Sequence, residues 1–149
     1  MALHIYIDTI PHSEQRYPTV GDYWRPKLFK NAIERLEVRV SDLGNEDYEF
    51  LVAIHELIEE HLTRKRGIPE EAITKFDIAF EQHRQTNSIE EPGDSPDAPY
   101  KCEHFFATSI ERLIAAELGI DWLAYSAKID SLFKTQEDSE NTPDQKLRK

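Results

Sequence analysis

The chain has 149 residues, of which 39% are hydrophobic and 32% are charged, with a formal net charge of −11. This length suits one domain with a modest core. The apolar runs are too short for a membrane span, and the opening residues MALHIYIDTI lack the pattern of a secretory signal. A single cysteine, Cys102, excludes an internal disulfide and suits a reducing cytoplasm. So acidic a chain lacks the basic face of a general nucleic-acid binder.

The acidity is concentrated in the middle of the chain. Residues 41–100 carry a net charge of −10, against +1 for residues 1–40 and −2 for residues 101–149. Two explanations fit this distribution: a solvated helical surface, or carboxylates gathered around a cation. The first is the more common arrangement in proteins, so the second needs support from the position of individual residues.

Two stretches near the N-terminus have the alternating pattern of β-strands. Leu3, Ile5 and Ile7 alternate with polar residues, which predicts a half-buried strand. Residues 36–40 repeat the pattern and predict a second strand. Between them, the proline-rich residues 11–26 are expected to form an ordered loop with a short hairpin. We therefore expect a small β element at the start of the chain.

The rest of the chain has helical periodicity, and residues 28–35 fit either a helical turn or a strand. Helices are predicted at about residues 46–66, 69–84 and 100–118, and a fourth after Asp121. Asn45 is expected to cap the first helix, and Pro69 to be the first residue of the second. Residues 1–134 should thus form one α+β domain, a small β element of two or three strands packed with three or four helices. Residues 135–149 are expected to be a disordered polar tail.

The first predicted helix carries the sequence HELIEEH. At 100° per residue, His55 and Glu59 share one stripe among apolar positions, where a carboxylate is costly unless it is paired or bound to a cation. In the HExxH pattern of zinc peptidases, two histidines hold the metal and the glutamate activates water. Here Glu59 takes the place of the second histidine. The pattern predicts His55 and Glu59 as ligands and Glu56 as general base, whereas His61 falls on the apolar arc and is interpreted as a core or partner-facing histidine. Glu60 is expected to be solvated.

The third predicted helix offers a further ligand. His104 and Glu111 lie two turns apart on one stripe beside alanines, which would let this helix approach the first one closely. We expect His104 to complete the metal site and Glu111 to support it. Asp77 and Glu103 are alternative ligands, and either would make the metal structural if it closed a fourth position. A buried His–Glu pair without any metal would give the same stripes.

The expected metal is a divalent ion. Two imidazoles and one carboxylate suit Zn²⁺ first, and the hardness of the carboxylate admits Mn²⁺ or Fe²⁺. Nothing in the sequence resembles a phosphate-binding glycine loop or a nucleophilic serine elbow.

Three blocks of the sequence resemble a family of small, uncharacterised proteins encoded by phages and prophages. The blocks are IPHSEQRYPTVGD, VSDLGNEDYEFLVAIHELIE and EPGDSPDAPYKCEHFFATSIERLIAAELGIDW, and the resemblance covers residues 3–125. It implies a cytoplasmic location in a bacterial host, and it implies no particular activity. It draws attention to residues outside the helical stripes, namely Ser13, Glu14, Arg16 and Tyr17.

Two more distant resemblances bear on function. A strand at residues 36–40 that leads into a helix with HExx is similar to the core of zinc-dependent peptidases, and this implies a strand that receives an extended peptide. The missing second histidine is a departure from that family. Alternatively, the acidic residues approximate the EExxE and ExxD pairs of all-α nucleotide pyrophosphatases, in which case the Mg²⁺ ligands would be Glu56, Glu59, Glu60, Asp77 and Glu81.

Two hypotheses for the function follow. The first is a metal-dependent hydrolase of a small molecule or peptide, with His12, Arg16 and Tyr17 of the loop binding the substrate. The second is a non-catalytic phage-encoded protein that binds or inhibits a host or defence protein, any metal being structural. In that case the aromatic side chains of the loop, Tyr17, Tyr23 and Trp24, would be exposed anchors.

Overall fold

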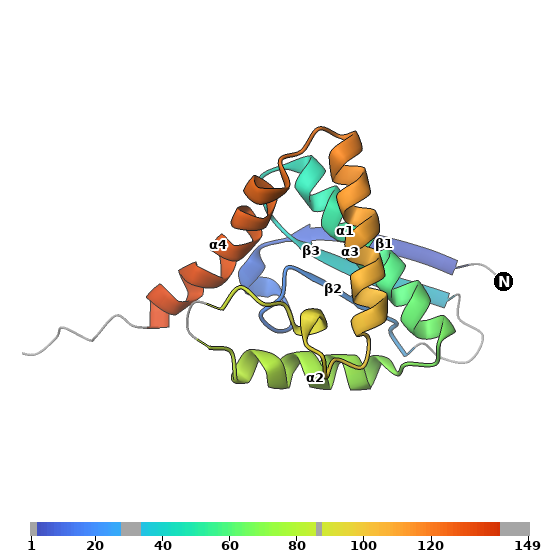
Figure 1. The fold of residues 1–149 in the computed structure, drawn as a ribbon. Helices are drawn as coiled ribbons and strands as arrows, with labels where there is room; N and C mark the ends of the chain where they lie inside the picture. The colour runs from blue at the N-terminus through green and yellow to red at the C-terminus, as the bar shows by residue number, and fades with distance from the viewer. Residues whose placement is uncertain (1–2, 28–33, 86–87, 141–149) are drawn as a thin grey trace, which may run out of the picture.

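The protein has the expected α+β architecture, a three-stranded sheet with four α-helices (Figure 1). The computed structural model describes residues 3–27, 34–85 and 88–140. The strands are β1 (Leu3–Ile10), β2 (Gly21–Trp24) and β3 (Glu34–Ser41). The helices are α1 (Glu46–Lys65), α2 (Glu70–Gln82), α3 (Lys101–Glu117) and α4 (Trp122–Glu140), with short 3₁₀ helices η1 (His12–Glu14) and η2 (Pro92–Asp94).

The sheet has the order β1-β3-β2, so β3 is its central strand. It pairs in parallel with β1 and antiparallel with β2. The inward residues of β3 are Leu36, Val38 and Val40, each at most 1% exposed, as the alternation of the sequence predicted. Because both edges of β3 are occupied, it cannot receive an extended peptide, and this part of the likeness to zinc peptidases is wrong.

Strand β1 differs from expectation in its burial. Leu3, Ile5 and Ile7 are 43–48% exposed, so the predicted strand exists but its apolar face is not buried. The reason is the position of α1, which packs over β3 and β2 (Figure 1). The ambiguous stretch at residues 28–35 lies mostly outside the described residues, and β3 begins at Glu34.

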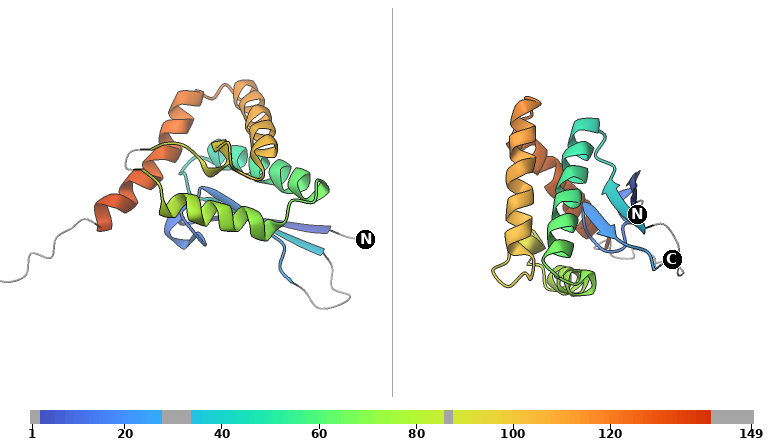
Figure 2. Two further views of the ribbon diagram at one scale, coloured as in Figure 1. Left: turned by 60° about the horizontal axis from the view of Figure 1, so that its bottom comes forward. Right: turned by 90° about the vertical axis from the view of Figure 1, so that its right-hand side faces the viewer.

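The helices form two further layers on one side of the sheet. In the right-hand view of Figure 2, α1 lies between the sheet and α3. The side chain of Asn45 caps α1 by accepting the N–H groups of Asp47 (3.0 Å) and Tyr48 (3.1 Å). Pro69 is the N-cap of α2 rather than its first residue, because α2 begins at Glu70.

The last helix is longer than predicted. Asp121 caps α4 by accepting the N–H groups of Leu123 (2.9 Å) and Ala124 (3.2 Å). The helix continues to Glu140, past the expected domain boundary at residue 134, and residues 141–149 of the predicted tail lie outside the described residues. Among the described helices, none is both long and apolar enough to cross a membrane.

The loop before β2 is fastened to the end of β3. Gln15 Nε2 donates to the carbonyl of Val20 (3.2 Å) and to Ser41 Oγ (3.1 Å). Arg16 makes two hydrogen bonds to the buried carboxylate of Asp22, at 2.6 and 2.9 Å. These contacts explain much of the IPHSEQRYPTVGD block, since they hold β2 in place beside α1.

Two residues near the C-terminal end of α1 correct the helical projection. Glu60, expected to be solvated, is buried and accepts hydrogen bonds from Arg25 Nε (2.8 Å) and Arg64 Nε (3.1 Å). His61, interpreted as a core or partner-facing histidine, is exposed, so the core alternative is wrong. The chain that follows β2 brings Arg25 over this side of α1 and buries Glu60. Glu81 is likewise held by an arginine. Among the described residues, no converging group of ligand atoms contains Glu56, Glu60, Asp77 or Glu81, so the acidic cluster of the pyrophosphatase likeness is not assembled.

The capping of α1 by Asn45 gives the first prediction. Replacing Asn45 by Ala removes the acceptor for two N–H groups and should lower the free energy of unfolding by about 1 kcal/mol. Chemical denaturation at constant pH measures this change. Asn45→Asp retains an acceptor and should stay close to the wild type, and equal losses in both variants would contradict a capping role.

Candidate metal centre

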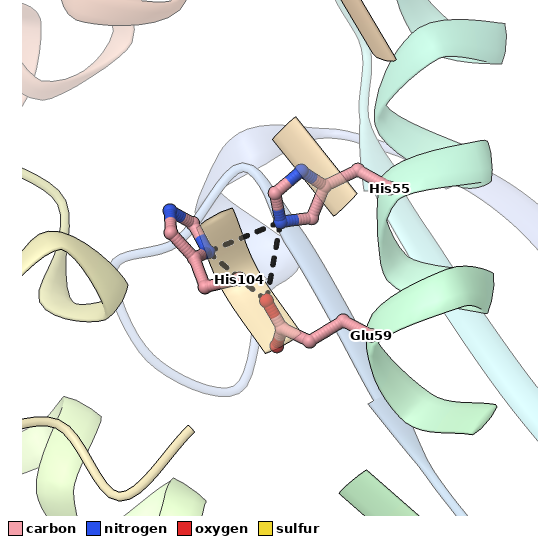
Figure 3. A group of neighbouring side chains, drawn as sticks. All are labelled: His55, Glu59 and His104. Atoms are coloured by element: carbon pink, nitrogen blue, oxygen red, sulfur yellow. Dashed lines mark hydrogen bonds and ion pairs between the residues drawn. The ribbon is translucent and has the colours of Figure 1, made fainter. Parts of the chain in front are cut away.

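Three buried side chains converge between α1 and α3 (Figure 3). His55 Nε2 lies 3.1 Å from Glu59 Oε2 and 3.1 Å from His104 Nδ1. The third side of this triangle, from His104 Nδ1 to Glu59 Oε2, is 3.0 Å. The i,i+4 spacing on α1 and the packing of α3 against it thus bring together the three residues that the sequence nominated as ligands. We call His55, Glu59 and His104 the triad.

The two triad residues on α1 are each fixed through their outer atom. His55 Nδ1 lies 2.8 Å from Glu111 Oε2, so Glu111 takes the supporting place behind His55. The other oxygen of Glu111 accepts the hydroxyl of Tyr125. Tyr23 donates its hydroxyl to Glu59 Oε1 at 3.1 Å, which leaves Glu59 Oε2 directed at the histidines. Carboxylates behind metal-binding histidines are a regular feature of metal sites.

His104 is fixed in the same way by the loop before α3. Its Nε2 lies 3.1 Å from Glu91 Oε2 and 3.5 Å from Asp94 Oδ1. Gly93 lies so close to the His104 ring that a Cβ at this position would overlap the imidazole. The turn of η2 therefore presses its backbone and two carboxylates against the outer edge of His104.

The outer hydrogen bonds determine which imidazole nitrogens carry a proton and which are free to bind a metal. When His55 donates Nδ1–H to Glu111 and His104 donates Nε2–H to Glu91, each ring has one remaining nitrogen with a lone pair. Those two nitrogens and Glu59 Oε2 point at the same small volume. Three acceptors at this distance repel one another unless a cation or a shared proton lies among them.

The spacing of the triad suits a metal ion. With metal–ligand bonds of about 2.1 Å, neighbouring ligands lie about 3.0 Å apart at 90° and about 3.4 Å apart in a tetrahedron. The three observed separations of 3.0–3.1 Å fit the first value and need only a small expansion to reach the second. Two imidazole nitrogens and one carboxylate oxygen are a common donor set for Zn²⁺ and Fe²⁺.

The charges around the triad favour a cation. Burial lowers the pKa of His55, but hydrogen bonds to Glu111 and Glu59 outweigh it and hold this pKa well above its usual range. Burial also opposes the charge on His104, yet Asp94, Glu59 and Glu91 raise its pKa to about 12. Against the effect of burial, the two histidines lower the pKa of Glu59 to about 2. The site therefore holds positive charge, as protons on the imidazoles or as a divalent ion that replaces those protons.

A cavity of about 100 Å³ opens beside the triad, and Glu56 lines it. Glu56 is half-buried and sits against the backbone of Gly21, where a Cβ would overlap its carboxylate. Burial and the nearby charge of Glu59 raise the pKa of Glu56 well above its usual range. A carboxyl group whose pKa is raised in a cavity is a candidate for proton transfer.

The two alternative ligands lie elsewhere. Asp77 lines the cavity but belongs to no group of converging ligand atoms among the described residues. It accepts hydroxyl hydrogen bonds from Tyr17 (3.1 Å) and Tyr100 (2.5 Å). Glu103 is buried and paired with Arg66 at 2.7 Å, so it serves as an ion-pair partner.

Of the loop residues proposed to bind substrate, only Tyr17 lines the cavity. His12 lies 2.9 Å from Ser41 Oγ, and Arg16 is held by Asp22. The proposed aromatic anchors are not exposed, because Tyr23 is 7% exposed and Tyr17 and Trp24 are half-buried.

Sequence reasoning missed several supporting residues of the site. They are Gly21, Tyr23, Glu91, Gly93, Asp94 and Tyr125, which reach the triad, Glu56 or Glu111 from three separate segments, β2, η2 and α4. The EPGD sequence of η2 carried a local signal, since Glu91 and Asp94 cap each other, but nothing local indicated that this turn meets His104.

No family model, curated protein or solved structure matches the chain.

Gly93 provides a test of the position of the His104 ring. In Gly93→Ala the added methyl group must push the imidazole or the turn aside, because its Cβ would overlap the ring. We expect zinc affinity to fall at least about 10-fold, the scale seen when the surroundings of a metal ligand are disturbed. Titration calorimetry measures it, with Asp97→Ala on the same loop as control. Unchanged affinity would contradict the described packing.

Asp77 provides a test of the charge balance in the cavity. Burial raises its pKa from the ordinary 3.8 to about 7, so between these values the folded chain holds a proton that the unfolded chain releases. This contribution to stability is complete below pH 4 and is lost as the pH rises through about 7. Asp77→Asn lacks this contribution. The free energy of unfolding of the variant, relative to that of the wild type, should therefore rise by on the order of 1–3 kcal/mol between pH 4 and pH 8. Denaturant unfolding with a chelator present measures this difference, and a pH-independent difference would refute it.

Proposed function

We propose that this protein is a divalent-metal-dependent hydrolase, with the triad as metal ligands and Glu56 as general base. The observation that carries the proposal is the open form of the site. Three side chains converge beside a cavity, and the outer atom of each is held by a carboxylate or a tyrosine. Catalytic zinc sites have three protein ligands and keep an open position, whereas structural sites are closed by four.

The two residues that the sequence suggested as a fourth ligand have other partners, which supports the open form. Asp77 is engaged by two tyrosine hydroxyls, and Glu103 is engaged by Arg66. Among the described residues, no other carboxylate, histidine or cysteine joins the triad within ligand distance of all three members. A purely structural metal in a binding protein would require such a residue, and this disfavours the non-catalytic alternative.

The chemistry follows from the groups around the cavity. A divalent ion of this kind, when bound, lowers the pKa of a coordinated water and polarises a substrate oxygen. Glu56 lines the same cavity and follows His55 directly in the chain, as the general base does in the HExxH pattern. Its raised pKa suits it to accept a proton from water and to pass it to a leaving group.

Zn²⁺ is the proposed ion, with Mn²⁺ and Fe²⁺ as alternatives that the same donor set accepts. A location in the bacterial cytoplasm, where these ions and a reduced Cys102 coexist, fits the proposal. The resemblance to phage-encoded proteins stays a prediction.

The hydrolase proposal is tested by metal binding and activity on the same samples. Chelator-treated wild type should bind about one equivalent of zinc in titration calorimetry, and His104→Ala should lose at least about 100-fold in affinity, since a ligand is removed. Glu56→Gln should still bind zinc but lose the hydrolysis of any amide or ester found in a chromogenic panel, by at least about 100-fold. Glu117→Gln, on the exposed end of α3, is the control.

Two outcomes would contradict the proposal. One is a wild-type chain that binds no divalent ion at micromolar protein concentration. The other is hydrolysis that survives in Glu56→Gln or in His104→Ala, because a contaminating enzyme or a different site would then be responsible.

A further inference from the structure

The cavity beside the triad is acidic. Eight of the side chains that line it are carboxylates, and Arg84 is the one lysine or arginine found in its lining among the described residues. Arg84 is itself held by Glu81, at 2.7 Å from each oxygen of that carboxylate. A bound divalent ion would offset only part of the remaining negative charge. Such a cavity repels anions and attracts cations.

Most of these carboxylates already have positive or hydrogen-bonding partners. Glu59, Glu91 and Glu111 support or form the triad, and Asp22 is neutralised by Arg16. Within the part of the chain that the structure describes, no cation pairs with Asp77. Its side chain is buried, with 7% exposed, and once ionised, as at the pH 8 of the test below, a buried carboxylate without a counter-charge is costly.

The surroundings of Asp77 keep its two oxygens in fixed positions. Tyr17 from the loop donates to Oδ2 at 3.1 Å, and Tyr100 at the start of α3 donates to Oδ1 at 2.5 Å. Each oxygen has a second lone pair available for another donor. Ile73 and Thr74 of α2 line the same cavity and would contact an aliphatic chain that reaches the carboxylate.

We propose that Asp77 is the binding site for a cationic group, an ammonium or a guanidinium, on the substrate of this cavity. The inference depends on the proposed function only in calling the ligand a substrate. It replaces the expectation that Arg16 and His12 bind the substrate, because both lie outside the cavity lining. The substrate would extend from Asp77 to the triad through one continuous cavity.

A second divalent ion is the competing occupant, and the geometry disfavours it. Metal sites need several ligand atoms that converge, and the described residues show such convergence only at the triad and at Glu91, Asp94 and His104. Asp77 belongs to neither group. A single carboxylate that already accepts two hydroxyl groups offers too few ligands for an ion such as Mg²⁺ or Ca²⁺.

A matched pair of probes tests the proposal. N-butylguanidinium and N-butylurea have nearly the same shape and differ in charge, and neither is a strong zinc ligand. Both are titrated into the zinc-loaded full chain at pH 8 and followed by protein NMR. We expect the guanidinium to bind at least about 10-fold more tightly, with shifts centred on Thr74, Asp77 and Tyr100. In Asp77→Asn the two affinities should lie within about 2-fold, and in Glu117→Gln the preference should persist.

Several outcomes would overturn the proposal. These are equal affinities in the wild type, shifts centred elsewhere, a preference that survives in Asp77→Asn, or a second equivalent of zinc that Asp77→Asn abolishes. If Asp77→Asn does not fold, the comparison of the two probes on the wild-type protein decides the question by itself. If the protein binds no zinc but prefers the guanidinium, the hydrolase proposal is contradicted and the cation site is retained. If it binds zinc but shows no preference, the cation site is contradicted and the hydrolase proposal is retained.

Discussion

Three potential ligand atoms directed at one point are the constraint on which the rest of the site depends. The two imidazole nitrogens and one carboxylate oxygen of the triad lie 3.0–3.1 Å apart, a separation that needs a cation or shared protons among them. The helices make this approach feasible. Ala107 and Ala115 on α3 are fully buried, and these small residues let α3 pack closely on α1.

The structure around the triad preserves this arrangement. Glu111, Glu91 and Tyr23 each hold the outer atom of one triad member, and each comes from a different segment of the chain. Metal affinity, where it exists, should therefore depend on residues that never touch the ion. The same carboxylates make the neighbouring cavity acidic. Positive charge is therefore favoured both at the triad and beside Asp77, and the cavity favours a cationic ligand.

The sequence predicted those residues of the site that lie on one stripe of a helix. His55 and Glu59 share a stripe one turn apart, and His104 and Glu111 share another two turns apart, so a regular helix was enough to group them. Tyr23, Glu91 and Asp94 reach the triad from a strand and a loop, where no periodicity relates them to it. Their roles follow only from the packing of β2 and η2 against the helices.

Burial was predicted wrongly in β1 and α1 for the same reason, because it depends on contacts between elements. Alternation predicted that β1 is a strand, but its apolar face is exposed because α1 covers only the other two strands. The projection of α1 placed Glu60 in solvent, whereas Arg25 covers its carboxylate and Glu60 is buried. The core alternative for His61 is wrong because this side chain is exposed. Patterns within one element predicted its type well, whereas the burial of each residue depended on which segment lies opposite.

The most direct test of the central claim is the X-ray absorption spectrum of the zinc-loaded protein at the zinc edge. We expect the zinc to be coordinated by two imidazole nitrogens, one carboxylate and at least one further oxygen from solvent, and by no sulfur. We also expect His55→Ala and His104→Ala each to remove one imidazole contribution. A shell that contains sulfur, four protein ligands without solvent, or no imidazole would contradict it.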